Sequence, residues 1–160
     1  MLIRFAQNQD IPRLIALLGQ IGNLHAQGRP DIFRSDALKY DAPALEKLLC
    51  DPTRPIFVAV ENDTVVGYCL CIKKAIQSDP VLAPRQELYI DDLCVDENFR
   101  GSGIGKALYR HALSYAKTSH MDTLTLNVWA FNQNALEFYK AMGMQVRNMT
   151  MELPLEDTPC

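Results

Sequence analysis

Hydrophobic residues repeat along the chain with two periods, which predict strands in some segments and helices in others. Apolar and β-branched runs bounded by turn formers predict strands at residues 2–5, 56–61, 64–74, 87–95, 122–129 and 144–153. Apolar residues three or four apart predict helices over about 11–22, 41–50, 103–118 and 132–142. The resulting order, β-α-α-β-β-β-α-β-α-β, predicts an α/β fold with one mixed sheet.

Residues 23–39 follow neither period. They mix turn formers with charged and aromatic residues, including His25 and Phe33. This composition is compatible with a surface connection and with the wall of a binding site.

The strand predicted at 87–95 runs through a short turn into a glycine-rich loop and a helix. Gly101, Gly103 and Gly105 lie within five residues, between Arg100 and Lys106. Glycine lets backbone N–H groups approach a ligand closely, and a helix N-terminus adds unpaired donors and a positive dipole end. The loop is therefore either a phosphate site or a tight turn that needs glycine only for its angles.

The spacing of this loop excludes two common phosphate-binding motifs. A P-loop requires a glycine five residues before its Gly-Lys and Ser or Thr after the lysine, whereas here Arg100 and Ala107 stand at those positions. A dinucleotide fingerprint requires a third glycine where Lys106 stands. The remaining pattern, Arg100 followed by Gly103 and Gly105, resembles the acetyl-CoA pyrophosphate loop of the GNAT family of N-acetyltransferases.

The resemblance extends beyond the loop. A strand ending in Asn127, Val128 and Trp129 precedes Asn132, which begins a helical segment containing Tyr139, as in that family. The match covers roughly residues 55–153. It implies a GNAT-like mixed central sheet flanked by helices, and an N-acetyltransferase that uses acetyl-CoA as its acetyl donor, with no metal and no covalent enzyme intermediate.

The resemblance also implies roles for individual residues. The expected cofactor-binding residues are Leu93, Cys94, Val95, Arg100, Gly101, Ser102, Gly103, Ile104, Gly105, Lys106, Asn127 and Asn132. Tyr139 is the expected proton donor to the coenzyme A thiolate, since an unperturbed tyrosine is protonated at neutral pH. Two alternatives stay open: Tyr139 is a core aromatic beside Phe138, and Asn132 is only a helix cap.

Asp91 and Asp92 are the candidate acceptor-binding carboxylates. Successive strand residues point to opposite faces, so only one can face a cleft unless a bulge, which the resembled fold has here, re-aims the other. The resemblance favours Asp92 as the catalytic group, with His25 and Phe33 bordering the acceptor site. Either aspartate could instead cap a turn or pair with a neighbouring base.

The acidic pair favours a small cationic amine, such as the substrates of polyamine acetyltransferases. A protein N-terminus or lysine is the alternative acceptor, and a non-catalytic module that only binds coenzyme A is the alternative to an enzyme. The resemblance also admits a homodimer.

Composition adds little to this prediction. The 160 residues are 48% hydrophobic and 22% charged with a formal charge of -3, which gives no reason to expect a nucleic-acid partner. No segment has the length of a signal-peptide core or a membrane span, which predicts a cytoplasmic protein that does not enter membranes. Five cysteines without zinc spacing predict free thiols. One domain is expected over residues 1–153, followed by a loose tail at 154–160.

Overall fold

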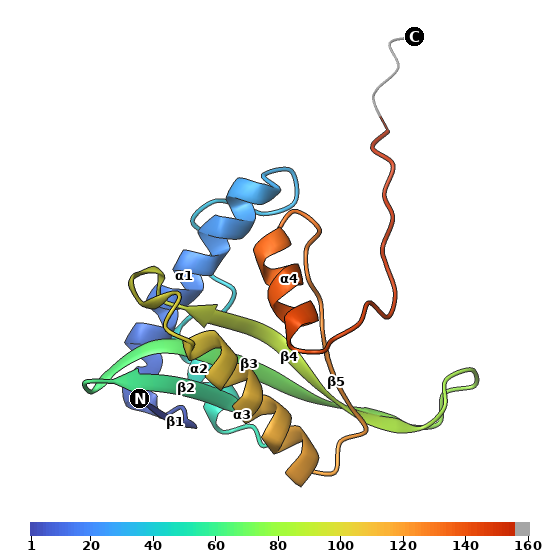
Figure 1. The fold of residues 1–160 in the computed structure, drawn as a ribbon, viewed down its shortest axis with the longest axis horizontal. Coiled ribbons are helices and arrows are strands. Elements are labelled where there is room, and N and C mark those ends of the chain that lie inside the picture. Colours follow the sequence, from blue (N-terminus) through green and yellow to red (C-terminus); the bar gives the residue numbers. More distant parts are fainter. Residues whose placement is uncertain (156–160) are drawn as a thin grey trace.

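The computed structural model describes residues 1–155 and shows one mixed five-stranded sheet with helices on both faces (Figure 1). The strands lie side by side in chain order: β1 (Leu2–Phe5), β2 (Ile56–Glu61), β3 (Thr64–Ile76), β4 (Arg85–Val95) and β5 (Thr123–Leu126). The α-helices are α1 (Ile11–Gly28), α2 (Ala42–Leu49), α3 (Ile104–Thr118) and α4 (Gln133–Ala141). Two 3-10 turns, η1 (Asn8–Asp10) and η2 (Glu97–Phe99), precede α1 and follow β4.

The first four strands are antiparallel neighbours, and β5 pairs with β4 in parallel. This arrangement confirms the predicted α/β class and mixed sheet. It also leaves the outer edge of β5 without a neighbouring strand in the described part of the chain.

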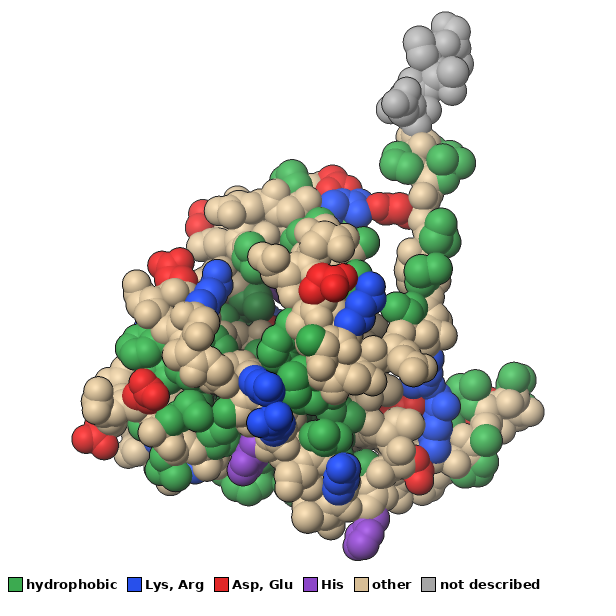
Figure 2. All heavy atoms as spheres, in the orientation of Figure 1, with side chains coloured by type: hydrophobic (Ala, Val, Ile, Leu, Met, Phe, Trp, Pro, Cys, Tyr) green, Lys and Arg blue, Asp and Glu red, His purple; other side chains and the backbone are tan. Residues whose placement is uncertain are grey.

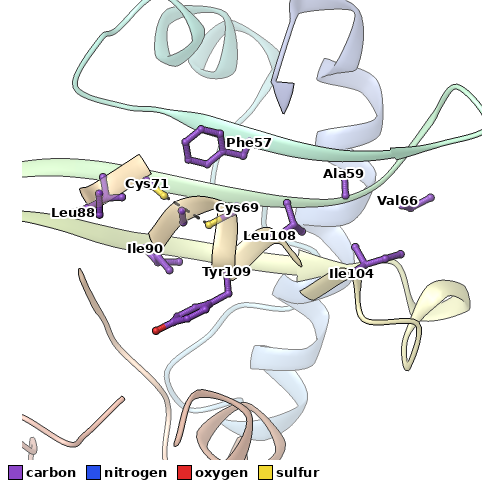
Figure 3. Packing of buried hydrophobic residues seen from close by; sticks show 12 residues of the cluster. Phe57, Ala59, Val66, Cys69, Cys71, Leu88, Ile90, Ile104, Leu108 and Tyr109 are labelled. Carbon is purple, nitrogen blue, oxygen red and sulfur yellow. Dashed lines mark hydrogen bonds between the residues drawn. The ribbon is translucent and has the colours of Figure 1, made fainter. Parts of the chain in front are cut away.

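A hydrophobic core on each face of the sheet holds the helices. On one face α3 inserts Leu108 and Tyr109 against a layer of strand residues that includes Ile90 (Figure 3). On the other face Leu14 of α1 and Leu45 of α2 are completely buried against β2 and β3. Burying a leucine stabilises a fold by about 1.5–3 kcal/mol, so these buried side chains hold the helices firmly on both faces of the sheet.

Helix α1 is longer than the sequence pattern predicted, because it continues through Gly22 to Gly28. A β-carbon at Gly22 would lie 3.1 Å from the backbone oxygen of Ala37. The glycine therefore lets the connection between α1 and α2 pass close to the helix, and does not end it. As a result α1 carries His25 and the first part of the segment that showed no period.

The last two predicted strands differ from the structure. The strand predicted at 122–129 is confined to Thr123–Leu126, and the strand predicted at 144–153 is absent: residues 144–155 have no regular secondary structure. A strand needs a partner for its backbone groups, and in the described chain these residues pair with none. Of the tail predicted at 154–160, residues 156–160 lie outside the described residues.

We call residues 144–155 the C-terminal arm. It leaves the end of α4 and projects beyond the body of the molecule (Figure 1). Two ion pairs join it to the rest of the chain: Arg147 with Glu87 at 2.8 Å, and Glu152 with Arg29 at 2.5 Å. No helix among residues 1–155 is long and apolar enough to cross a membrane.

Candidate active site

The register between β3 and β4 shifts by one residue at Asp91. Ile90 pairs with Cys71 and Asp92 pairs with the adjacent Leu70, so Asp91 has no residue opposite it. Asp91 is therefore the additional residue of a β-bulge, which is the feature that the resemblance implied at this point.

The bulge turns both carboxylates to the same face of the sheet, the face covered by α1 and α2. Asp91 contacts Tyr40 and Asp92 contacts Tyr68, and both tyrosines belong to the core on that face. Ile90, one residue earlier, belongs to the opposite core. Both carboxylates therefore lie on one face of the sheet, whereas adjacent residues of a regular strand point to opposite faces.

Asp92 is partly buried, and its hydrogen-bonding side-chain partner is neutral. The hydroxyl of the buried Tyr68 donates to its Oδ2 at 2.8 Å. Burial raises the pKa of Asp92 to about 6, opposed by the Tyr68 hydrogen bond, the Lys39 charge and the N–H of Leu93. Asp92 is therefore mostly ionised at neutral pH and is a stronger base than an exposed aspartate.

Asp91 is surrounded by cationic groups. Lys39 Nζ lies 3.0 Å from its Oδ1, the Tyr40 hydroxyl donates to its Oδ2 at 2.8 Å, and Arg54 lies 3.8 Å away. Arg54 also donates to the Tyr40 hydroxyl at 2.8 Å. The charge of Asp91 is thus balanced within the protein, and Asp92 is the carboxylate of the pair that lacks a direct cationic partner among the described residues.

Beyond the bulge, β4 and β5 separate. Their pairing ends where Ile90 meets Leu126, while β4 continues to Val95. The N–H of Asp96 donates to β3 at 2.9 Å, and alternate residues of a strand point their N–H groups to opposite sides. The N–H groups of Leu93 and Val95 therefore point away from β3, into the opening. The Cys94 side chain is placed differently, because its Sγ contacts α1.

The glycine loop lies where β4 ends and α3 begins. Gly101 and Gly103 have φ values of 79° and 83°, a left-handed conformation that other residues adopt at a cost. Gly103 is the N-cap of α3, and its carbonyl accepts from the N–H of Ala107 at 3.0 Å. The N–H groups of the first turn remain unpaired within the helix. Arg100 and Lys106 are exposed on either side, so the loop fits an anionic ligand.

Gly105 connects this loop to the opening. A β-carbon on Gly105 would be 3.6 Å from Val95, 3.8 Å from Phe138 of α4 and 4.0 Å from Leu93. The first turn of α3 therefore lies directly beside the stretch of β4 whose Leu93 and Val95 N–H groups point away from β3. Ser102 turns back, and its hydroxyl donates to the Phe99 carbonyl at 2.5 Å.

Helix α4 borders the opening on the side of β5. Asn132 is its N-cap, and its Oδ1 accepts from the N–H of Ala135 at 3.2 Å; its contact with the cofactor stays a prediction. Tyr139 packs its ring against Tyr109 and Phe138, with centroids 6.2 and 5.0 Å away. Burial raises its pKa, so its phenol stays protonated at neutral pH. Asn127, the first residue after β5, is exposed at the rim.

Four aromatic residues join the end of α1 to the loop between β5 and α4. His25 stacks on Phe33 at 5.0 Å, Phe33 meets Trp129 edge-on at 4.9 Å, and Trp129 stacks on Phe131 at 6.4 Å. Gly28 allows this junction, because a β-carbon there would lie 2.2 Å from the Phe131 ring. We call these four residues the aromatic cluster. Trp129, which the sequence placed at the end of a predicted strand, lies beyond β5 and packs in this cluster.

The structure thus brings together residues from every part of the chain. Burial and the charge of Lys39 lower the pKa of His25, and the same lysine pairs with Asp91. Lys39, Tyr40, Arg54 and Tyr68 were not predicted as site residues. Lys39 and Tyr40 stand at the end of the segment without a period, and nothing local in the sequence links any of the four to Asp91 or Asp92.

Comparison with known proteins agrees with this geometry. The profile described as the acetyltransferase (GNAT) family matches residues 20–144. The chain belongs to that family. The match includes β4, the glycine loop, α3 and α4.

Individual GNAT relatives support the assignment. The peptidyl-lysine N-acetyltransferase YjaB of Salmonella typhimurium is 37% identical over 105 residues, covering 64% of this chain and 59% of that protein. An uncharacterised N-acetyltransferase of Methanocaldococcus jannaschii is 34% identical over 93 residues, covering 58% of this chain and 40% of that protein. The chain therefore spans about half the length of these curated relatives.

Solved structures show the same fold. A mutant of the BH1408 protein from Bacillus halodurans superposes with a TM-score of 0.93 at 33% identity, covering 97% of this chain and 99% of that one. An aminoglycoside N-acetyltransferase, AAC(6')-Iy, solved in complex with CoA, superposes with a TM-score of 0.70 at 14% identity, covering 96% of this chain and 98% of that one. At 14% identity, the similarity to AAC(6')-Iy shows only a shared fold.

Proposed function

We propose that the protein is an acetyl-CoA-dependent N-acetyltransferase that transfers the acetyl group directly to a primary amine. The observation that carries this proposal is the continuity of β4. The strand passes from the bulged aspartate pair, past backbone N–H groups that face the opening, to an anion-binding loop at the N-terminus of α3. Anion site, hydrogen-bonding edge and acid–base groups thus follow one another along one strand.

Acetyl-CoA fits this order. The first turn of α3, with Arg100 and Lys106, binds the pyrophosphate. The backbone of Leu93 and Val95 bonds the pantetheine as an added strand would. The Leu93 N–H also donates to the oxyanion that forms on the thioester carbonyl, where a positioned donor stabilises the developing charge.

Two side chains handle the protons in this proposal. Asp92 takes a proton from the acceptor ammonium, so that the free amine can attack the carbonyl carbon. The new C–N bond forms, the attacking nitrogen loses its second proton to solvent, the C–S bond breaks, and Tyr139 gives its phenolic proton to the departing thiolate. Solvent then restores both groups. Burial raises the pKa of Asp92, which makes it a stronger base. Burial also raises the pKa of Tyr139, which keeps the phenol protonated at neutral pH but makes it a weaker acid than a free tyrosine.

For the acceptor we propose a small cationic amine, held by Asp92 and bordered by the aromatic cluster. An aromatic face beside a carboxylate is a favourable environment for an ammonium group. A peptidyl lysine is the second candidate, favoured by the 37% identity to a peptidyl-lysine N-acetyltransferase. Two further alternatives are a protein N-terminus as the acceptor and a module that binds coenzyme A without turnover. The experiment below distinguishes them.

The test combines binding with turnover. Thermal shift with acetyl-CoA measures binding, and thiol release over a panel of diamines, aminoglycosides, lysine peptides and N-terminal peptides measures transfer. The control is Gly103→Val, which forces a side chain into a left-handed position beside the pyrophosphate site. We expect a stabilising shift that Gly103→Val loses, and thiol release highest with a diamine. Binding without release from any amine would leave only a coenzyme A module, and an unchanged shift in a folded Gly103→Val protein would refute the loop assignment.

We also propose that residues 1–153 function as one domain in the cytoplasm. The two hydrophobic cores share a single sheet, which supports one folding unit. The Sγ atoms of the buried Cys69 and Cys71 lie 3.7 Å apart as free thiols, which fits a reducing compartment.

A further inference from the structure

The C-terminal arm has the sequence pattern of a strand but no strand partner in its own chain. Met149, Met151 and Leu153 alternate with Thr150 and Glu152, so an extended arm places its apolar groups on one face. These three side chains are 76–83% exposed, and Figure 2 shows hydrophobic side chains along the arm where it projects from the body. An unpaired segment of this pattern is normally covered by another strand.

The same molecule has an unpaired strand edge. β5 pairs with β4 on one side, and no described strand lies on its other side. Asp122 directs its N–H to β4, so the N–H groups of Thr123 and Thr125 point to the free edge. An unpaired strand edge of this kind is a template for pairing with another strand.

Helix α4 gives a second sign that the sheet is incomplete. None of its residues is fully buried, although Phe138 and Tyr139 pack against the core formed with α3. Leu124 and Leu126 of β5 pack against the same core. An additional strand beside β5 would extend this apolar layer beneath α4 and cover more of its inner face.

We propose that the C-terminal arm of a second copy of this chain pairs antiparallel with the free edge of β5, and that two copies exchange their arms in this way. In Figure 1 the arm and β5 run in the same direction, joined through α4. A twofold-related arm runs the opposite way, so it can pair antiparallel with β5 on one side and with the first arm on the other. Such an isologous exchange satisfies both unpaired strands at once.

The ion pairs of the arm favour this exchange over pairing with its own β5. Arg147 and Glu152 attach the arm to Glu87 and Arg29 at two separate points. No backbone hydrogen bond between the arm and β5 occurs within residues 1–155. The arm is therefore held extended and ready for a partner, which lowers the entropy cost of ordering it on association.

The test compares two double variants that each remove two exposed hydrophobic groups. Met149→Lys with Met151→Lys changes the arm, and Val81→Lys with Leu82→Lys changes the loop between β3 and β4, where the side chains are 87% and 47% exposed. Light scattering after size exclusion should give about 36 kDa, twice 18.0 kDa, for the unmodified chain and the loop variant, and half that mass for the arm variant. Circular dichroism and the acetyl-CoA thermal shift check that each variant is folded.

Hydrogen exchange then locates the contact. Amide protons of residues 123–126 should exchange more slowly in the unmodified dimer than in the arm variant. A monomeric unmodified chain, or a dimer that survives the arm substitutions, would overturn the proposal. A dimer in which the β5 amides exchange equally fast in both proteins would place the contact elsewhere and overturn it too. These outcomes are independent of whether the chain acetylates an amine.

Discussion

Replacing Asp92 with asparagine should stabilise the folded chain while impairing acetyl transfer. The folded carboxyl titrates near pH 6, whereas an unfolded aspartate titrates near pH 4. Between these values the folded chain binds more protons, so stability falls as the pH rises through this window. Above it the ionised Asp92 lowers the free energy of unfolding by about 3 kcal/mol, and asparagine, which cannot ionise, removes this loss.

The expected gain is smaller than that limit, because the asparagine amide must also be desolvated. Asparagine can still accept the Tyr68 hydrogen bond. We therefore expect about 1–3 kcal/mol of added stability near pH 8, which raises the Tm by several degrees in a chain of this size. Near pH 4 the wild-type carboxyl is protonated in the folded state, and the gain should largely disappear.

Asp91→Asn is the matched control, because it makes the same chemical change at the neighbouring residue. Asp91 is paired with Lys39 and Tyr40, so its loss leaves a cation without a partner and should destabilise the chain. Urea denaturation of the three proteins near pH 8 and near pH 4 measures both effects. If Asp92→Asn is destabilising at the higher pH, or if its gain does not depend on pH, the description of Asp92 as a desolvated base is wrong.

Three further substitutions test the other parts of the site. Tyr139→Phe should lower kcat by about 10²–10⁴-fold with little change in acetyl-CoA affinity; a loss below threefold at every pH of a thiol-release assay would leave Tyr139 a packing residue. Lys39→Met should lower KM for a diamine by about two- to fivefold, because it frees Asp91 for the acceptor; a higher KM would show that the Lys39 charge does not compete with the substrate. Gly28→Ala should displace the Phe131 ring and raise KM for the acceptor, measured against an unchanged thermal shift with acetyl-CoA; an unchanged KM would exclude the aromatic cluster from the acceptor site.

The sequence predicted the parts of the fold that depend on local pattern. The helix after the glycine loop begins one residue after Gly103, because the left-handed glycine and the apolar period are both encoded locally. Asn132 likewise caps α4 as its position before an apolar period indicated. The sequence pattern ends α1 too early, at Gly22, because a glycine lowers helix propensity. The helix continues, and the glycine is needed there for close contact with the chain near Ala37, which the local sequence does not show.

The strand predicted at 144–153 is absent because strand formation depends on a partner as well as on the sequence pattern. Residues 144–153 alternate well enough to predict a strand, but the edge that would accept them determines whether they form one. In this chain the arm is extended and its backbone is unpaired. A pattern read from one copy of the chain cannot distinguish pairing within that copy from pairing between two.

The site shows the same division between local and distant information. Asp91 and Asp92 are identical and adjacent, and only the structure separates their roles, because the partners of Asp91 lie 37 to 52 residues away at Arg54, Tyr40 and Lys39. With those two cations the acidic pair has no surplus negative charge, since two carboxylates face two cationic side chains. The inference from sequence that two aspartates attract a cationic acceptor therefore reduces to Asp92 alone. A site without surplus negative charge binds the ammonium form of an amine less firmly than a strongly acidic site would. It therefore favours the uncharged amine, which is the form that attacks a thioester.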